Sequence, residues 1–578
     1  MRRLLATVSA VVLTGALLCA PAEAADPAGG AISDSATSVT WNAGPFAVPN
    51  TTGLLGDPIC NAVTVCDDFR LTVSTPAGYG DTHDLRIQIG WPNAAADFDL
   101  YVLDAAGAII ASSASSGDPE VVLLPPTSGV YTVRAVPFAP LAQSLTGTAS
   151  LVAKPANPPP STFPAPAFGS YAAPAGLAHS NDAGEPSIGV DWFTGATMYQ
   201  AGLGTFRVLW DANGSPMWTD TSAPLALTSL DPILYTDPTT GRTFESQLAG
   251  KTSLMEFSDN DGNTWLPSQG GGINSGVDHQ TVGGGPFAPN GLGALTGYPH
   301  AVYYCSQDIA DASCALSRDG GVTFGPAVPI YNLLTCGGLH GHVKVSSDGV
   351  VYVPNKSCGG NQALAVSSDN GLTWTVRKNP LSTAGNTDPS VGIGANGTVY
   401  LGYHAADGHA RIAVSHNRGV TWESDQDVGA QLGLQNIVFP AVVAGDDNRA
   451  AFAFLGTTSG GNYQDAANFH GVWHLYVSTT YDGGTSWKTV DVTPNDPVQR
   501  GSICTAGTTC GSDRNLLDFM DVTIDKQGRI LVGFADGCVG ACVIAGPNSF
   551  SAWATIARQT GGLTLFSRYD QPLKGKKK

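Results

Sequence analysis

Acidic and histidine side chains recur at one point of a repeating pattern that runs through residues 185–523 of this 578-residue chain. The pattern is a short apolar segment, and its seven copies begin Glu185-Pro-Ser-Ile, Asp231-Pro-Ile-Leu, His279-Gln-Thr-Val, Gly341-His-Val-Lys, Asp388-Pro-Ser-Val, Phe439-Pro-Ala-Val and Met520-Asp-Val-Thr. Carboxyl groups held close together raise one another's pKa, so that one keeps its proton while another stays ionised. Cleavage of a glycosidic bond requires such an acid and base. The candidate catalytic residues at or beside the segment starts are Glu185, Asp278, Asp388 and Asp518.

The same carboxylates have a structural alternative. Asp before Pro commonly caps backbone amides at a turn, and Asp231 and Asp388 fit either interpretation. The shared position in all seven segments favours a common site, because it brings residues far apart in the sequence to the same end of the fold.

Histidines and an arginine accompany the carboxylates. His340-Gly-His342 places two imidazoles on one face of a predicted strand, since side chains alternate along a strand. With Asp278 or His279 they can bind a metal, or they are hydrogen-bonded structural groups. Arg514 lies in the run Asp513–Asp521 and is suited to grip a ligand. We assign substrate binding to four residues: His279, His340, His342 and Arg514.

The elements that position these residues are indicated by five turn motifs of the form Ser/Thr-x-Asp/Asn-x-Gly-x-x-aromatic. They run from Ser258 to Trp265, Ser317 to Phe324, Ser367 to Trp374, Ser415 to Trp422 and Thr480 to Trp487. The Asp or Asn side chain folds back onto backbone amides, and Gly adopts a conformation closed to other residues. Between segment start and turn motif lie aromatic residues that we expect in the core: Tyr199, Phe244, Tyr303, Tyr352, Tyr400 and Phe452. Repeats at starts 59, 50, 48 and 65 residues apart predict propeller blades.

The turn motif resembles the Asp box, or BNR repeat, of the sialidase superfamily, and the resemblance covers residues 176–570. It implies a β-propeller in which the boxes lie at the blade periphery, away from the active site. The seven segment starts predict seven blades, with the inner strands around a channel and their leading loops forming one funnel. Sialidases place the first of three substrate-binding arginines on the first inner strand. Here that position reads Glu185-Pro-Ser-Ile, and no segment start contains Arg, so the resemblance does not extend to sialic acid as substrate.

Residues 38–153 carry no such motif and alternate apolar and polar residues, which predicts a small antiparallel β-sandwich. Asp97-Phe-Asp-Leu-Tyr-Val, Asp104-Ala-Ala-Gly107 and Ser128-Gly-Val-Tyr-Thr-Val133 resemble the bacterial pre-peptidase C-terminal domain. The resemblance implies an accessory module of a secreted enzyme. Asp97 and Asp99 share a strand face and either hold Ca²⁺ or are solvated polar positions; no other cofactor is expected.

The remaining segments indicate export. Residues 1–24 read as a signal peptide, 154–175 as a Pro-rich linker and 571–578 as a basic tail. An exported, extracellular protein allows disulfides, and neighbouring cysteines give the simplest pairing: Cys60–Cys66, Cys305–Cys314, Cys336–Cys358, Cys504–Cys510 and Cys538–Cys542. A zinc site is the alternative use of these cysteines. The net charge of −19 argues against nucleic acid or an anionic membrane as partner.

The sequence therefore predicts an all-β protein, and three functions stay open. The first is a secreted, monomeric glycosidase that acts on a glycan or polysaccharide. The second is a polysaccharide lyase with His340 or His342 as base and Arg514 as uronate clamp. The third is a non-catalytic glycan- or protein-binding propeller, because fold alone does not decide function.

Overall fold

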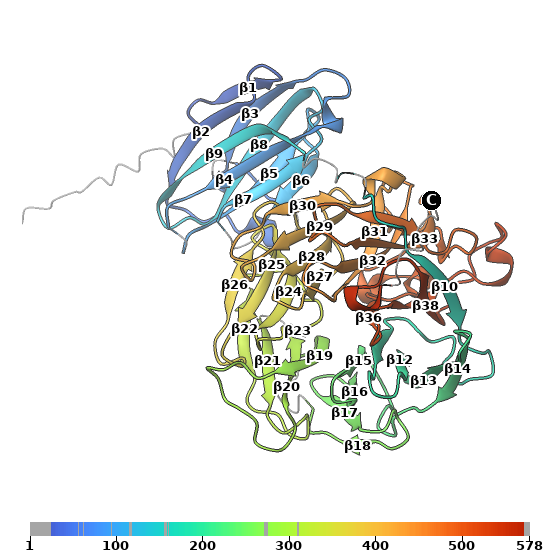
Figure 1. The fold of residues 1–578 in the computed structure, drawn as a ribbon. Helices are drawn as coiled ribbons and strands as arrows, with labels where there is room; N and C mark the ends of the chain where they lie inside the picture. The colour runs from blue at the N-terminus through green and yellow to red at the C-terminus, as the bar shows by residue number, and fades with distance from the viewer. Residues whose placement is uncertain are drawn as a thin grey trace, which may run out of the picture. The chain divides into compact units, whose positions relative to one another are not determined.

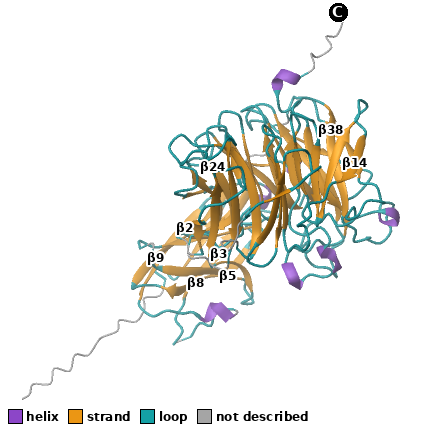
Figure 2. Cartoon of the chain, turned by 90° about the horizontal axis from the view of Figure 1, so that it is seen from below, coloured by secondary structure: helices purple, strands orange, loops and turns teal. Residues whose placement is uncertain are grey.

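The computed structural model describes residues 25–55, 57–61, 63–93, 95–114, 118–154, 159, 161–270, 276–308, 311–333 and 335–570. The predicted signal peptide, the basic tail and part of the predicted linker lie outside these residues. Strands dominate, as Figure 2 shows, and the predicted all-β class is confirmed. The short 3-10 turns are Thr52–Leu55, Tyr79–Asp81, Ala430–Leu432, Gly507–Thr509, Ser512–Arg514, Gly540–Cys542 and Ser567–Tyr569. Within the described residues no helix is long and apolar enough to cross a membrane.

The chain divides into two compact units, and the first contains the described residues up to 114 and 118–152. Its five-stranded sheet has the order β1 (Gly29–Ser33), β3 (Asp67–Ser74), β8 (Gly129–Ala139), β5 (Asp97–Leu103) and β6 (Ile109–Ser113). Its four-stranded sheet has the order β2 (Ser38–Phe46), β9 (Gln143–Ala153), β4 (His83–Gly90) and β7 (Glu120–Leu124). One hydrophobic core collects residues from both sheets, with Trp41 stacked on Phe69 at 3.9 Å between ring centroids. The pairing of β1 with β3 is parallel, which differs from the antiparallel domain that the alternation predicted.

The second unit holds the described residues from 153 onward and is built of antiparallel sheets, most of them with four strands in chain order. The first sheet contains β11 (Ser187–Val190), β12 (Thr197–Ala201), β13 (Gly204–Trp210) and β14 (Pro216–Asp220). The second contains β15 (Pro232–Thr236), β16 (Thr243–Leu248), β17 (Ser253–Ser258) and β18 (Leu266–Pro267). The third contains β19 (Asp278–Pro286), β20 (His300–Gln307), β21 (Asp311–Ser317) and β22 (Val328–Asn332). Two more are β23 (Lys344–Val345), β24 (Val351–Cys358), β25 (Asn361–Ser367) and β26 (Thr375–Lys378), and β27 (Ser390–Ile393), β28 (Val399–His404), β29 (Ala410–Ser415) and β30 (Ser424–Asp427). The next is β31 (Asn436–Ala444), β32 (Ala450–Thr457), β33 (Val472–Thr480) and β34 (Lys488–Asp491), with β35 (Gln499–Arg500) paired to β33.

The remaining sheet joins the two ends of this unit. It contains β36 (Asp521–Ile524), β37 (Ile530–Asp536) and β38 (Trp553–Gly561), and its outer strand β10 (Ala167–Ala172) comes from the start of the unit. β10 pairs with β38 antiparallel, so that Tyr171 lies opposite Ile556. The residues of β10 belong to the segment that the sequence predicted as a linker.

The first strands of the sheets contact one another in a cycle. β11 contacts β15, and contacts continue through β19, β23, β27, β31 and β36 back to β11, so the sheets follow one another around a centre (Figure 1). Each of the seven predicted apolar segments contains such a first strand or leads into it. This arrangement is propeller-like.

The aromatic residues expected in the core are buried there. Tyr199, Phe244, Tyr303, Tyr352, Tyr400 and Phe452 are all fully buried, on the second strands of their sheets. The prediction that they pack rather than bind ligand is confirmed, because no part of their surface is left for a ligand.

The five turn motifs share one hydrogen-bond pattern between the third and fourth strands of their sheets. In the third copy, Ser367 Oγ accepts from the amide of Gly371 at 2.9 Å and Asp369 Oδ1 accepts from the amide of Thr373 at 2.9 Å. The other four copies repeat both bonds at 2.7–3.0 Å. In this copy Gly371, which follows Asp369 and Asn370, has a φ of +76°. Glycine adopts this backbone conformation readily because it has no Cβ.

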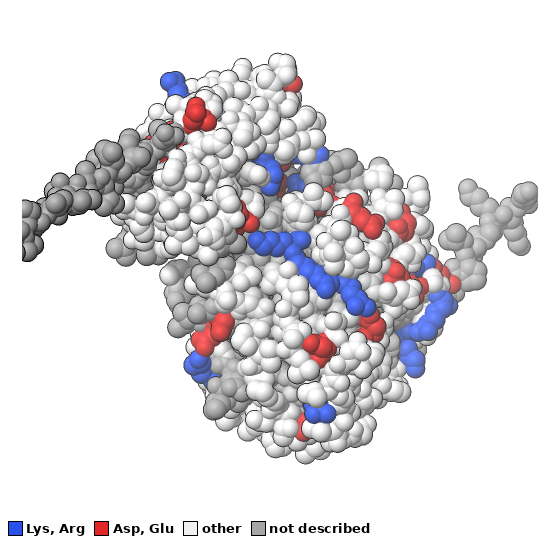
Figure 3. All heavy atoms as spheres, turned by 90° about the vertical axis from the view of Figure 1, so that its left-hand side faces the viewer, with Lys and Arg blue, Asp and Glu red and all other residues white. Residues whose placement is uncertain are grey.

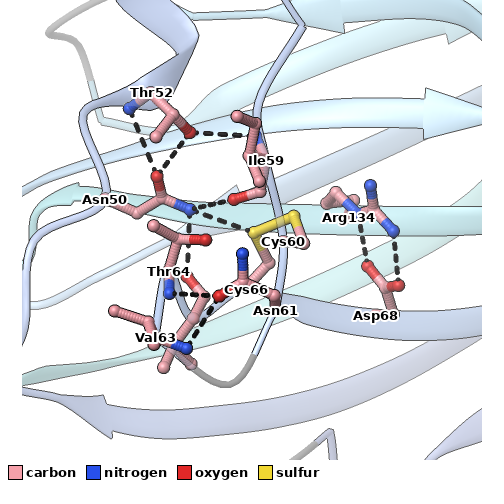
Figure 4. The surroundings of a disulfide bond; sticks show 11 residues. Asn50, Thr52, Ile59, Cys60, Asn61, Val63, Thr64, Cys66, Asp68 and Arg134 are labelled. Atoms are coloured by element: carbon pink, nitrogen blue, oxygen red, sulfur yellow. Dashed lines mark hydrogen bonds and ion pairs between the residues drawn. A yellow bond between two sulfur atoms is a disulfide. The ribbon is translucent and has the colours of Figure 1, made fainter.

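All five predicted disulfides are present: Cys60–Cys66, Cys305–Cys314, Cys336–Cys358, Cys504–Cys510 and Cys538–Cys542. Figure 4 shows the first of them, where Asn50 Nδ2 donates to the carbonyl oxygens of Ile59 at 3.1 Å and Val65 at 3.3 Å. The cysteines are therefore used in covalent links and not as zinc ligands. On the face drawn in Figure 3, basic and acidic side chains lie in small groups on a mostly uncharged surface.

Candidate functional site

The residues that lead into the first strands gather around one cavity of the second unit. Its lining includes Asp231, His279, His340, His342, Asp388 and Phe519. These residues come from the segments before or at the start of β15, β19, β23, β27 and β36. The convergence that the repeated pattern predicted is therefore found for these positions.

His279 lies at the centre of the charged network. Its Nε2 hydrogen-bonds to Asp388 Oδ2, and its Nδ1 lies 3.6 Å from Asp278 Oδ1. Burial by itself lowers the pKa of His279, but the Asp388 and Asp278 carboxylates outweigh burial and hold that pKa well above its usual value. The backbone of His279 has a φ of +49°, which is rare for a residue with a side chain and marks a constrained position.

Asp388 is held by two cations. Lys356 Nζ lies 3.1 Å from Asp388 Oδ1, while Asp388 Oδ2 bonds to His279. Burial raises the pKa of Asp388, but His279 and Lys356 together bring it well below its usual value. Asp388 is thus an ionised partner of His279, and the capping interpretation is wrong for it because its carboxylate is taken up by side chains.

Glu185 and Asp518 form a second pair beside the first. Both terminal nitrogens of Arg514 donate to the two oxygens of Asp518. Burial, followed by the charges of Asp231 and Asp518, raises the pKa of Glu185 well above its usual value. Glu185 Oε2 is buried without a hydrogen-bond partner among the described residues. Like His279, Glu185 has a left-handed backbone, with a φ of +56°.

Asp231 and Asp521 hold neighbouring sheets together. Asp231 Oδ2 accepts from the amide of Gln280 at 2.7 Å, and Asp521 Oδ2 accepts from the amide of Ile188 at 3.2 Å. The same link is made by Ser390 Oγ, which accepts from the amide of Val442 at 2.9 Å. The capping interpretation is therefore correct for Asp231, although only one of its two oxygens is used this way.

Asp278 differs from the other carboxylates in its exposure. Its side chain is 59% exposed, whereas the side chains of Asp388 and Asp518 are 10% and 22% exposed. The hydrogen bond with His279 lowers the pKa of Asp278 against the smaller effect of burial. Asp278 is the ionised carboxylate of this group that an incoming ligand reaches most easily.

The two histidines of the His-Gly-His run border the cavity from before β23. His340 Nδ1 donates to the carbonyl oxygen of Gly341 at 3.0 Å, and the ring of His342 meets the ring of Phe519 edge-on at 4.5 Å. Burial lowers the pKa of each imidazole to about 4. The regular strand begins only at Lys344, and His340 forms an isolated bridge to Asn355, but both histidines line the same cavity.

Two other arginines that could serve a ligand are occupied elsewhere. Arg207 Nη1 donates to Asn263 Oδ1 at 2.6 Å, and Arg500 Nε donates to the carbonyl oxygen of Cys542 at 2.7 Å. Arg514 is thus the arginine that the described residues supply to the network.

Sequence reasoning missed Lys356, which lies near the end of β24 outside any motif. The available signal was a single lysine that follows the apolar run Val351-Tyr-Val-Pro. It also missed Phe519 and Gln280, which line the cavity. Their neighbours in the sequence were named as candidates, but these two side chains carry no charge and gave no signal of their own.

In the first unit, Asp97 and Asp99 both lie on β5. Asp99 is buried, and Asp97 Oδ1 is buried without a hydrogen-bond partner among the described residues. Burial raises the pKa of Asp99 to about 7, with a further contribution from the charge of Asp97. The alternative of a fully solvated position does not fit the buried Asp99.

Comparison with known proteins gives structural likeness without a family. No family model matches the chain, and no curated protein matches it. The NanB sialidase from Streptococcus pneumoniae is 10% identical, with 82% of this chain and 94% of that chain covered and a TM-score of 0.35. A streptogramin B lyase is 12% identical (68% and 97% covered, TM-score 0.37), and a protein of unknown function from Dyadobacter fermentans is 13% identical (68% and 97% covered, TM-score 0.34). Similarity at this level says nothing about the activity of this chain.

Proposed function

We propose that the second unit is a seven-bladed β-propeller that hydrolyses glycosidic bonds of a glycan or polysaccharide outside the cell. The observation that carries the proposal is the buried carboxyl group of Glu185 near the charge of Asp518, whose two oxygens accept from both terminal nitrogens of Arg514. The cycle of first-strand contacts supports the blade count, and the five disulfides support an oxidising, extracellular setting.

The roles follow from the different surroundings of the carboxyl groups. Glu185 is the proton donor, because its buried carboxyl group lies against a second carboxylate and is favoured in its neutral form. Asp518 is fixed by Arg514, and its negative charge helps to keep the proton on Glu185. Asp278 is the exposed, ionised carboxylate that activates water or attacks the sugar. Carboxyl groups in contrasting environments are how hydrolases obtain an acid and a base at one pH.

The alternatives fit the site less well. A lyase would need Arg514 free to hold a uronate, but both of its terminal nitrogens already donate to Asp518. A sialidase would need several arginines at the site, and the described residues supply one. The third alternative is a binding propeller without catalysis. Glycan binding with no hydrolysis in the following experiment would support it.

The test is a screen of the purified protein against plant, bacterial and host glycans, followed by Glu185→Gln and Asp518→Asn. Each change should lower kcat/KM by about 100-fold or more, as expected for loss of acid–base catalysis, while the melting temperature stays within the range of the wild type. Asp348→Asn is the matched control, because Asp348 forms an exposed ion pair with Arg418 at 2.6 Å. Unchanged turnover in both site variants, or glycan binding with no hydrolysis, would contradict the proposal.

For the first unit we propose an accessory module in which Asp97 and Asp99 hold Ca²⁺. The buried, unpartnered oxygen of Asp97 and the buried carboxyl group of Asp99 support this, since Ca²⁺ is bound by oxygen ligands. Calcium should raise the melting temperature of the wild type and leave that of Asp99→Asn unchanged. An equal response of the two proteins, measured by calorimetry, would remove the assignment.

A further inference from the structure

Three side chains at the cavity bring potential metal ligands together. Asp231, Asp278 and His279 each offer one ligand atom, and these atoms lie within 4.8 Å of one another. Asp231 comes just before β15, and the other two open β19, so neighbouring sheets build the group. Ligand atoms that are each about 2.0–2.2 Å from one ion lie at most about 4.4 Å apart, so the side chains need only a small inward adjustment to surround an ion.

Two atoms of this group are buried and unused. Asp231 is 5% exposed, and only its Oδ2 is engaged, by the amide of Gln280. Asp231 Oδ1 and His279 Nδ1 have no hydrogen-bond partner among the described residues. A buried carboxylate oxygen without a partner is costly, and an ion at this position would remove that cost.

The Nε2 atom of His279 makes the kind of hydrogen bond that orients a metal-binding imidazole. His279 Nε2 hydrogen-bonds to Asp388, and Asp388 is fixed in turn by Lys356 at 3.1 Å. Metal-binding histidines almost always donate their second ring N–H to a carboxylate, a backbone carbonyl or a water, because the bond sets the tautomer and the ring orientation. A metal ion that binds His279 must displace a ring proton. With Nε2 engaged by Asp388, the nitrogen left for the ion is Nδ1, which lies 3.6 Å from Asp278 Oδ1.

The balance of charge points the same way. The network contains the carboxyl groups of Glu185, Asp231, Asp278, Asp388 and Asp518. The lasting cations that face it are Lys356 on Asp388 and Arg514 on Asp518. Neither cation forms an ion pair with Asp231 or Asp278 in the described structure, so the positive group described beside these two carboxylates is the imidazole of His279. An ion bound at this imidazole would displace its proton and supply the positive charge instead.

We infer that Asp231, Asp278 and His279 form a binding site for one divalent transition-metal ion of the Zn²⁺ or Mn²⁺ type. An imidazole among the ligands favours these ions over Ca²⁺ and Mg²⁺, which take oxygen ligands. Three protein ligands leave at least one coordination position for a water or a ligand hydroxyl group. If the ion is bound, Asp278 is one of its ligands. A water on the ion would then replace Asp278 as the attacking group in the proposed hydrolysis, on which this part of the inference rests.

The experiment measures metal uptake by the full chain, without reference to activity. Protein stripped with a chelator is dialysed against Zn²⁺, Mn²⁺ or Ca²⁺, and bound metal is counted by mass spectrometry. The wild type should take up one Zn²⁺ or Mn²⁺ per chain. Pulsed electron paramagnetic resonance of the Mn²⁺-loaded protein should show a directly bound imidazole nitrogen, which His279→Gln abolishes.

Matched variants separate this site from the rest of the network. Asp278→Asn changes an exposed side chain and should abolish uptake, and Asp388→Asn should weaken binding about 10- to 100-fold as loss of an outer-shell partner does. Asp237→Asn alters a buried Asp–His pair elsewhere, in which His300 Nδ1 lies 2.7 Å from Asp237 Oδ2, and should leave uptake unchanged. Asp518→Asn should keep the metal while losing the proposed hydrolysis, so the two proposals can fail independently. Equal uptake by the wild type and Asp278→Asn, or uptake of Ca²⁺ alone, would overturn the inference.

Discussion

At the scale of single residues, identical sequence signals lead to different roles. Asp231 and Asp388 both precede Pro at the start of an apolar segment. Asp231 caps the amide of Gln280, whereas Asp388 pairs with His279 and Lys356. The sequence could predict that both lie at one end of the fold, but the division of roles depends on which side chains the neighbouring sheets supply. Lys356 could not be predicted for the same reason, since it reaches Asp388 from another sheet.

A buried carboxyl group away from the site should make stability depend on pH. Glu245 on β16 is fully buried, and burial raises its pKa to about 8, against the hydrogen bonds from Gln247 and Gln200 that lower it. Because the folded-state pKa lies above the unfolded value, the neutral group favours the folded state below about pH 4.5, and this contribution is lost as the pH rises through 8. The melting temperature of the wild type should therefore fall between pH 7 and pH 9.

Glu245→Gln supplies the comparison, because glutamine keeps the shape of the neutral group and cannot ionise. Its melting temperature should fall less over the same pH range, with a difference of about 2 °C or more at pH 9. Scanning calorimetry at pH 6, 7.5 and 9 measures this. Parallel curves for the two proteins would show that folding does not raise the pKa of Glu245.

At the scale of elements, the turn motifs were the most predictable feature. Their hydrogen bonds are local, since Ser or Thr, Asp or Asn, and Gly lie within a few residues of one another. Pairing between distant segments was harder to predict. The short sequence Ala167-Phe-Gly-Ser-Tyr-Ala172 follows a Pro-rich stretch and carries no turn motif, so nothing local indicates that it pairs with β38.

Strand β10 should be required for the stability of the second unit. A protein that begins at residue 161 keeps β10, whereas one that begins at residue 176 lacks it and leaves an edge of β38 unpaired. The longer protein should melt like the second unit of the full chain, and the shorter one should melt several degrees lower or aggregate. Equal melting temperatures for the two truncated proteins would show that β10 adds nothing to the unit.

At the scale of the whole molecule, the repeat period predicted the order of the sheets, and the cyclic contacts of their first strands agree with it. The repeat could not predict chemistry, because the residue at this position varies among the sheets and even the two Asp residues there have different partners. Glu185, Asp231, His279 and Asp388 occupy equivalent places and have four different sets of partners. The proposed activity therefore depends on differences between the repeats, and the fold depends on what they share.

The disulfides have a consequence for how the chain matures. Each joins a cysteine to the next one along the described chain, across separations of 6, 9, 22, 6 and 4 residues. A chain that emerges from a membrane pore with its N-terminus first can therefore oxidise its cysteines in the order in which they appear, and every such link is native. Correct pairing needs no later exchange between distant thiols. Every link closes a local loop, and none joins two sheets. Reducing agents would therefore open five local loops and leave the contacts between the first strands of the sheets in place.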